Sequence, residues 1–192
     1  IFKNTHYFFG RTDWDRRVTK LLSPNAEYFF CSEALRSAII KSEKWQYHAQ
    51  KKKVLITSTI SSPVYKGADV ILKAAKLLTE NTDIEFEWNV YGVSEICMQE
   101  RFTGIKCKAV NVYCRGTINA DQLADRLLHS DVYMHPSYID NSPNSVCEAQ
   151  YIGLPVVAQG VGGVPTLLKD GAGVLVPSND AYQTAYFIQQ IG

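Results

Sequence analysis

The chain alternates short runs of apolar and β-branched residues with longer stretches in which apolar residues recur every three or four positions. The longer spacing places apolar residues on one face of a helix, whereas short β-branched runs between polar turns are typical of buried strands. The expected strands cover residues 54–60, 84–91, 109–114, 131–135, 155–158 and 173–176. Strands and helices that alternate in this way predict an α/β fold with a doubly wound, Rossmann-like parallel sheet.

The first 45 residues follow a different pattern. An extended run at 6–9, a helix over 12–22, an extended run at 26–31 and a short helix begun by Ser32 form a β-α-β-α unit, which is too small for a core of its own. The chain begins with Ile and ends in an apolar-patterned segment, so we expect a fragment of a longer protein. The expected parts are the tail of an N-terminal domain (1–45), a polar linker (46–53) and a C-terminal domain truncated at its end (54–192).

Composition narrows the classes of partner. The 192 residues include 20 Lys and Arg and 19 Asp and Glu, for a net charge of +1, and the dispersed charges argue against nucleic-acid binding. Five cysteines without C-x-x-C spacing are typical of reduced core thiols. The sequence has no apolar run of membrane-span length and no signal peptide at its start. We expect a cytoplasmic protein, and peripheral contact of the full-length protein with the inner face of the membrane stays open.

The most informative candidate chemistry follows the run 131–135. Asp140 and Glu148 stand eight positions apart, and between them Ser142 and Pro143 are typical of a helix start, with Ser142 as the cap. The free N–H groups of that helix would then lie at the carboxyl edge of the sheet, where phosphates bind. Carboxylates suit sugar hydroxyls, because they accept the hydrogen bonds that hydroxyls donate. The alternative is a solvated loop acid and an exposed helix acid, but the apolar neighbours of Glu148 indicate a buried carboxylate that needs a partner.

A lysine and several glycines are further candidates. Lys66 opens the helix after the first strand, where a cation opposes the helix dipole unless it holds an anion; an exposed loop lysine is the alternative. Gly92 ends a strand without a side chain to block the crevice, and Gly162 and Gly163 form a tight loop that lets backbone approach a ligand or a neighbouring helix. The loop is no dinucleotide fingerprint, since Pro165 stands where its third glycine should be.

A metal site is not indicated. Asp13 and Asp15 form a D-x-D triplet, a pattern that ligates the cation in many metal-dependent sugar-nucleotide enzymes, but Thr12 before them completes a capping box at a helix start. The four histidines lack metal-ligand spacing. His135, at a strand end, has the crevice within reach, although a packed histidine is the better interpretation. We expect no cofactor and no required metal.

Several of these segments together resemble a known family. "YKGADVILKAAKLL", "VYG" and the run from "RGTINADQLADRLLHS" through "HPSYIDNSPNSVCEAQYIGLPVV" to "GAGVLVP" are similar to the C-terminal, donor-binding domain of the group-one (family four) retaining glycosyltransferases of GT-B fold. The similarity extends from about Val54 to Pro177. "GRTDWDRRVTKLLSPNAEYFFCSEALR" resembles the segment that closes the N-terminal domain in some bacterial members.

The resemblance implies an activity and residue roles. The whole enzyme would transfer a sugar, with retention, from a nucleoside-diphosphate sugar to a saccharide or lipid-linked acceptor, and this chain would supply donor binding without the acceptor half. Glu148 would bind the ribose hydroxyls, Asp140 would face the donor sugar, and Lys66 would bind the diphosphate. Backbone contact to the diphosphate is expected from Asn144 and Ser145.

The sequence also departs from the family pattern. Asp140 stands where the family usually has a Glu, one methylene longer. The Arg that usually precedes the Lys is absent, because "TSTISSPVYKG" offers only Ser and Thr. Diphosphate charge would fall mainly on Lys66 and the helix N-terminus, with Arg115 after the third strand as an additional contact.

Other functions stay open at this point. A GT-B-fold enzyme that is not a transferase, such as a sugar-nucleotide epimerase, would need acid and base groups over the sugar. A non-catalytic nucleotide-binding module would tolerate loss of the crevice residues. A nicotinamide enzyme is disfavoured by the broken glycine fingerprint.

Overall fold

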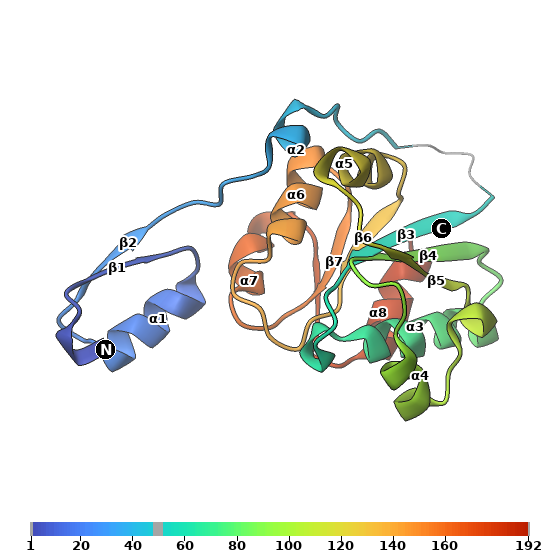
Figure 1. Ribbon diagram of the computed structural model, residues 1–192, viewed down its shortest axis with the longest axis horizontal. Coiled ribbons are helices and arrows are strands. Elements are labelled where there is room, and N and C mark those ends of the chain that lie inside the picture. The colour runs from blue at the N-terminus through green and yellow to red at the C-terminus, as the bar shows by residue number, and fades with distance from the viewer. Residues whose placement is uncertain (1, 48–51, 192) are drawn as a thin grey trace.

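The α/β part of the chain contains one six-stranded parallel sheet. The computed structural model describes residues 2–47 and 52–191, so residues 48–51 of the expected linker lie outside the described residues. The strand order is β5-β4-β3-β6-β7-β8, and every pair is parallel (Figure 1). This order confirms the doubly wound sheet. The strands are β3 (Val54–Thr59), β4 (Phe86–Tyr91), β5 (Val112–Gly116), β6 (Val132–His135), β7 (Val156–Gln159) and β8 (Val174–Val176).

Helices cover both faces of this sheet (Figure 1). On one face pack α3 (Ala68–Asn81), α4 (Cys97–Thr103) and α8 (Ala181–Gln189). On the other pack α2 (Ser37–Lys41), α5 (Ala120–Leu128), α6 (Asn144–Ile152) and α7 (Val164–Leu167). Short 3-10 turns, η1 (Phe2–Asn4), η2 (Val64–Lys66), η3 (Cys107–Val110) and η4 (Lys169–Gly171), complete the described elements.

The sheet packs in a buried apolar core that also contains a short chain of hydrogen bonds between strands. Trp88 is fully buried, and its Nε1 donates to Ser58 Oγ at 3.0 Å. Ser58 Oγ in turn donates to the carbonyl of Met134 at 2.7 Å. These hydrogen bonds connect β4, β3 and β6, and each of the buried polar atoms in them has a partner. The three strands therefore hold the carboxyl edge of the sheet in a fixed register.

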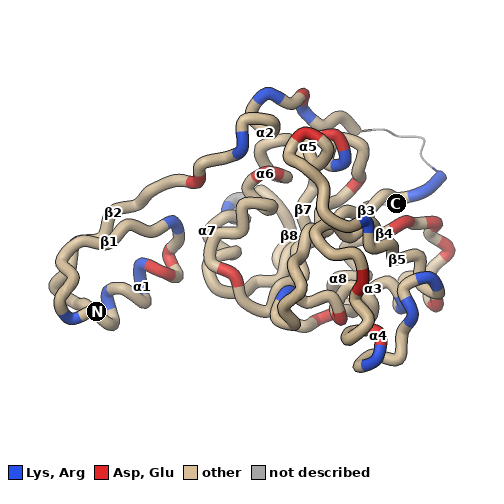
Figure 2. The backbone as a smooth tube through the Cα atoms, in the orientation of Figure 1, with Lys and Arg blue, Asp and Glu red and all other residues tan. Residues whose placement is uncertain are grey.

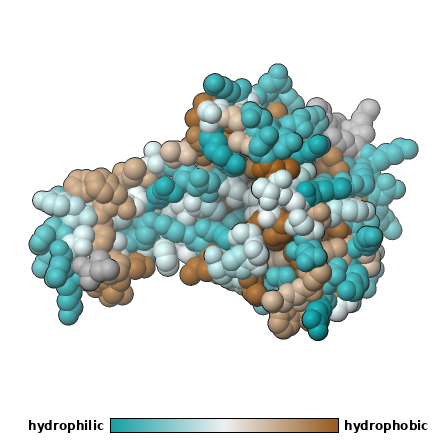
Figure 3. All heavy atoms as spheres, in the orientation of Figure 1, coloured by the Kyte–Doolittle hydropathy of each residue, from teal (hydrophilic) through white to brown (hydrophobic). Residues whose placement is uncertain are grey.

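The N-terminal residues form a small separate lobe of β1 (Tyr7–Gly10), α1 (Asp13–Leu22) and β2 (Glu27–Phe30), with the two strands parallel (Figure 1). Thr12 caps α1 and completes the predicted capping box with Asp15. The lobe leaves large apolar side chains exposed, seen as tan and brown atoms on its surface (Figure 3). These include Phe9, at 75% exposure, and Leu21, at 80%. As expected, two strands and one helix do not enclose a core.

The prediction that a short helix begins at Ser32 is wrong. The helix α2 begins at Ser37, and the residues before it are extended because Glu33 and Arg36 reach out to side chains of the α/β domain. Ile39 of α2 is fully buried in the core of that domain. Trp45 follows, and its Nε1 donates to the carbonyl of Ser130 at 2.7 Å. The segment from Arg36 to Trp45 therefore packs on the α/β domain.

The charged residues are dispersed, as expected from the sequence. Basic and acidic residues are interspersed along the chain (Figure 2). All five cysteines are free thiols, but the prediction of core thiols is wrong for Cys31 and Cys97, which are exposed. Among the described residues, no helix is both long and apolar enough to cross a membrane.

Candidate functional site

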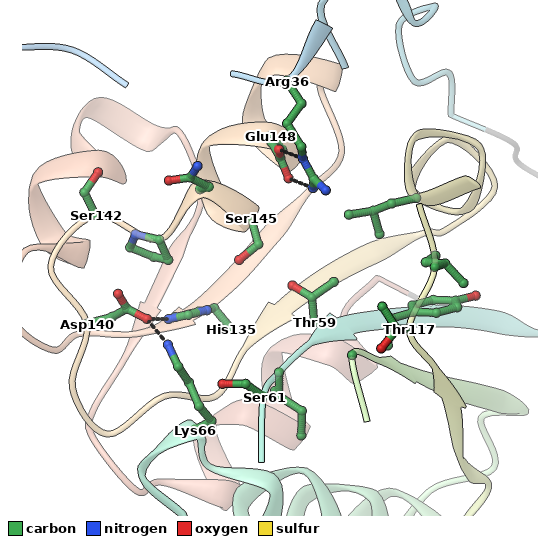
Figure 4. Close-up of a pocket in the computed structure, with 17 residues that line it drawn as sticks. Arg36, Thr59, Ser61, Lys66, Thr117, His135, Asp140, Ser142, Ser145 and Glu148 are labelled. Atoms are coloured by element: carbon green, nitrogen blue, oxygen red, sulfur yellow. Dashed lines mark hydrogen bonds and ion pairs between the residues drawn. The ribbon is translucent and has the colours of Figure 1, made fainter. Parts of the chain in front are cut away.

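A cavity of about 490 Å³ opens at the carboxyl edge of the sheet. The strands β3 and β6, which are neighbours there, lead into helices on opposite faces, so the crevice between them is the switch point at which open α/β sheets bind ligands. The lining residues come from the ends of β3, β4 and β6, from η2, from α5 and the segment before it, from α6 and the loop before it, and from the segment before α2 (Figure 4). They are Arg36, Thr59, Ile60, Ser61, Lys66, Tyr91, Gly92, Thr117, Ile118, Leu123, His135, Asp140, Ser142, Pro143, Asn144, Ser145 and Glu148.

Asp140 is an ionised carboxylate between two partners (Figure 4). Lys66 Nζ donates to its Oδ2 at 2.8 Å, and His135 Nε2 lies 3.5 Å from the same oxygen. Burial raises the pKa of Asp140, but its interactions with His135 and Lys66 outweigh burial and lower the pKa to about 2. A carboxyl group with this pKa accepts hydrogen bonds and does not act as an acid near neutral pH.

His135 is part of this wall and is also buried, at 2% exposure. Neither ring nitrogen has a hydrogen-bond partner among the described residues. The sequence favoured a packed histidine over one that reaches the crevice. In the structure His135 is both packed in the interior and part of the cavity wall. A buried imidazole with unsatisfied nitrogens beside a carboxylate is a polar group that a ligand in the cavity can pair with.

Glu148 has a partner that the sequence did not indicate. It lies in the second turn of α6, as expected, and its side chain is fully buried. Arg36 donates from Nε to Glu148 Oε1 and from Nη2 to Glu148 Oε2, both at 2.6 Å (Figure 4). The hydrogen bond to Glu148 raises the pKa of Arg36 against the opposing effect of burial. Such a bidentate pair is the strong form of a carboxylate contact.

The α6 N-terminus faces the cavity through Asn144 and Ser145. The prediction that Ser142 caps this helix is wrong: α6 begins at Asn144, Pro143 occupies the cap position, and the cap makes no side-chain hydrogen bond. The reason is a competing contact, because Ser142 Oγ donates to Glu33 Oε2 at 2.8 Å. The first N–H groups of α6 therefore lack a side-chain cap, which suits an anion.

Two glycines hold the cavity wall in shape. Gly67, which follows Lys66, has φ +73°, and a Cβ there would lie 1.9 Å from the carbonyl oxygen of Pro136. Gly92 has φ +93°, and a Cβ there would lie 2.2 Å from the carbonyl oxygen of Ile60. Glycine is therefore required at both positions by close backbone contact and not only to leave the crevice open.

Comparison with known proteins agrees with this architecture. Residues 51–191 match the family model described as "Glycosyl transferases group 1". The chain is 30% identical over 132 residues to a D-inositol 3-phosphate glycosyltransferase of Arthrobacter sp. (strain FB24), which covers 66% of this chain and 31% of that protein. It is 29% identical over 133 residues to an uncharacterized 41.2 kDa protein in the cps region of Klebsiella pneumoniae, covering 69% of this chain and 35% of that protein.

The chain belongs to the group 1 glycosyltransferases.

Solved structures show the same fold. A sucrose-phosphate synthase from Thermosynechococcus elongatus superposes with a TM-score of 0.77 at 19% identity, covering 99% of this chain and 50% of that one. WaaG, a glycosyltransferase involved in lipopolysaccharide biosynthesis, gives 0.76 at 17% identity, covering 95% and 52%. The chain thus has the Rossmann-like half of a GT-B glycosyltransferase, and it spans about a third of the curated relatives and half of these structures.

Three predicted site residues of this chain, Arg115, Gly162 and Gly163, do not line the cavity. Arg115 donates from Nε to Asn89 at 2.6 Å and from Nη2 to Glu87 at 2.8 Å, on the polar edge of β4 and β5. Gly162 and Gly163 pack beneath the loop that carries Asp140, and Gly163 N donates to the carbonyl of Asp140 at 3.0 Å. The close backbone approach predicted for them is made to this loop.

The D-x-D triplet contacts both the N-terminal lobe and the α/β domain. Asp15 accepts from Asn141 Nδ2 at 2.8 Å, and Asp13 accepts from Lys169 Nζ at 2.6 Å. Thr12, besides capping α1, donates from Oγ1 to Asn141 Oδ1 at 2.5 Å. These contacts account for both acids structurally, and no cluster of three or more His, Cys, Asp or Glu side chains suited to a metal ion occurs within residues 2–47 and 52–191.

Sequence reasoning missed Arg36 and the hydroxyl groups of Thr59, Ser61 and Thr117 in the cavity wall. Thr59 is the last residue of β3, and Ser61 and Thr117 closely follow the ends of β3 and β5, so position is the only sequence signal for these hydroxyls. Arg36 had a weaker signal. It lies in the segment that resembles the close of the N-terminal domain, and Glu148, as a buried acid, needed a cation from somewhere in the chain.

Proposed function

We propose that this chain binds the nucleoside-diphosphate sugar of a retaining glycosyltransferase. The observation that carries the proposal is the geometry of one cavity: an uncapped helix N-terminus, Lys66, and the carboxylates of Asp140 and Glu148 line the same wall at the sheet's switch point. This set of groups complements a ligand that has a diphosphate between two hydroxyl-bearing rings.

Each group has a role that follows from its chemistry. The diphosphate lies at the N–H groups of Asn144 and Ser145 and is neutralised by Lys66. Asp140, held ionised, accepts hydrogen bonds from hydroxyls of the donor sugar, and Glu148 accepts them from the ribose. Thr59, Ser61 and His135 offer further polar contacts along the same wall.

Transfer then depends on fixed electrostatics. Negative charge grows on the leaving diphosphate in the transition state. The helix amides and Lys66, which turns to the diphosphate from Asp140, stabilise that charge, so no metal ion is required. The acceptor, a saccharide or a lipid-linked saccharide, reaches the sugar from the other half of the enzyme. Such an enzyme works in the cytoplasm, and a lipid-linked acceptor would bring the full-length protein to the inner face of the membrane.

The test is calorimetric titration of the chain with UDP, GDP and ADP and with the matching nucleosides. At least one diphosphate should bind more tightly than its nucleoside. Lys66→Ala should weaken that diphosphate by about 2 kcal/mol, the scale of a hydrogen bond to a charged group, and leave the nucleoside nearly unchanged.

Lys76→Ala is the matched control, because Lys76 is a surface residue of α3 whose ion pair with Glu80 lies outside the cavity. It should leave both affinities unchanged. Failure of every nucleoside diphosphate to bind would contradict the proposal. Equal loss of diphosphate and nucleoside in Lys66→Ala would show that Lys66 supports the fold and does not bind phosphate.

A further inference from the structure

Arg36 reaches the cavity from the segment between β2 and α2, outside the sheet domain. Its side chain is 44% exposed, whereas Glu148, to which it is paired, is fully buried. A guanidinium carries five N–H donors in a rigid fork. Two of them hold Glu148, and no other described residue accepts a hydrogen bond from Arg36. The exposed side of the guanidinium therefore keeps donors for a second acceptor in the cavity.

The charge balance of the cavity favours a second cation for a bound diphosphate. Within the described part of the chain, the only Lys and Arg side chains that line the cavity are Arg36 and Lys66, and they are paired with Glu148 and Asp140. The two ion pairs are thus formally neutral. A diphosphate brings at least two negative charges, and Lys66 alone would have to balance them while also holding Asp140.

The position of Arg36 fits a diphosphate at the α6 N-terminus. Glu148 follows Asn144, the first residue of α6, by four positions, which is about 6 Å along the helix axis. Arg36 therefore lies within about one turn of the free N–H groups. Lys66 and Arg36 approach from opposite sides of Ser145 (Figure 4). An anion bound at the helix start would lie between the two cations.

We propose that Arg36 is the second cation of the donor site: it neutralises Glu148 in the free chain and turns to the diphosphate when ribose hydroxyls take its place on Glu148. This inference rests on the proposed function. It also links donor binding to the segment that connects the two lobes, because Arg36 directly precedes α2. Donor binding thereby exchanges the partners of both ion pairs while every buried charge keeps a partner.

Inorganic pyrophosphate is the probe that isolates this role. Removing Arg36 alone would leave Glu148 as an uncompensated charge that repels any anion, so the decisive comparison uses the neutral variant Glu148→Gln as the background. Glu148→Gln should bind pyrophosphate more tightly than the unaltered chain, because it releases Arg36. The double variant Arg36→Ala/Glu148→Gln should bind it about tenfold more weakly than Glu148→Gln, the scale of one charge-assisted hydrogen bond.

Arg101→Ala in the Glu148→Gln background is the matched control, since Arg101 is exposed on α4 and outside the cavity. It should leave pyrophosphate affinity unchanged, and thermal unfolding checks that each variant folds. Equal pyrophosphate affinity with and without Arg36 in the Glu148→Gln background would overturn the proposal. Tighter binding without Arg36 would also overturn it, because Arg36 would then only neutralise Glu148 and would not bind the anion. Because pyrophosphate carries no base or sugar, these results stand even if no nucleotide binds and the proposed function fails.

Discussion

Asp140 shows how one residue's surroundings determine its chemistry. The side chain is shorter than the Glu usual in the family, yet Lys66 and His135 both converge on its Oδ2. Their combined effect lowers the pKa from 3.8 to about 2, against burial, which raises it. Asp140 therefore accepts hydrogen bonds and carries no proton at physiological pH, and this argues against the acid or base role that an epimerase would need.

This lowered pKa predicts a pH-dependent contribution to stability. A carboxyl group whose pKa is lower in the folded than in the unfolded state stabilises the fold above its unfolded pKa, and the contribution is lost as pH falls through the folded value. For Asp140 the loss spans the range from about pH 4 to about pH 2. Denaturant unfolding should show Asp140→Asn less stable than the unaltered chain by about 2 kcal/mol at pH 7, and nearly equal to it at pH 2.

Asp83→Asn provides the control, because Asp83 is exposed. It should change stability by less than about 0.5 kcal/mol at either pH. An Asp140→Asn deficit of the same size at pH 7 and pH 2 would show that the ion pair with Lys66 and the contact with His135 contribute little, and that packing of the carboxylate explains its stability effect.

At the scale of elements, the turn that joins η2 to α3 decides where Lys66 points. Gly67 and Gly104 both have positive φ, at +73° and +69°, but a Cβ would meet the Pro136 carbonyl only at Gly67, and would meet nothing within 4 Å at Gly104. The backbone of β6's following loop thus packs directly on the residue after Lys66. This contact brings Lys66 within reach of Asp140.

The two glycines make a matched pair for mutation. In Gly104→Ala the only strain is the left-handed backbone conformation, so this substitution should lower the free energy of unfolding by about 1 kcal/mol. Gly67→Ala adds the clash with Pro136 and should cost more than about 2 kcal/mol in denaturant unfolding. It should also weaken diphosphate binding, which Gly104→Ala should leave unchanged. Equal destabilisation by the two substitutions would contradict the close contact at Pro136.

The sequence predicted elements well where local pattern decides them. The apolar period of α3 and the Thr12 capping box of α1 are both confirmed, because their signals lie within a few residues. The start of β5 was expected at residue 109 but lies at Val112, since η3 takes residues 107–110 and Asn111 turns the chain at φ +55°. Such a turn has no periodic signal.

The same limit explains the site. The helix position of Glu148 and the placement of Lys66 at the crevice follow from strand and helix order. The cap of α6 and the partner of Glu148 do not, because Ser142 bonds to Glu33 and Glu148 to Arg36, contacts that span 109 and 112 residues. Local propensity cannot predict a partner that is so distant in the sequence.

At the scale of the whole molecule, the two lobes meet at the loop that carries the site. Asn141 contacts Thr12 and Asp15 of the N-terminal lobe, and Ser142 contacts Glu33 of the segment that follows it, so residues from the N-terminal part of the chain hold the two residues after Asp140. Arg36 adds the contact to Glu148. The cavity is thus lined by the sheet domain, which supplies Lys66, Asp140 and the α6 N-terminus, and by Arg36 of the segment between β2 and α2.

A crystal structure of the chain with the nucleoside diphosphate that binds most tightly is the most direct test of this account. We predict the diphosphate at the N–H groups of Asn144 and Ser145 between Lys66 and Arg36, with the ribose hydroxyls on Glu148. A diphosphate bound away from the α6 N-terminus, for instance in the cavity beside Cys107 and Cys114 under β5, would contradict it.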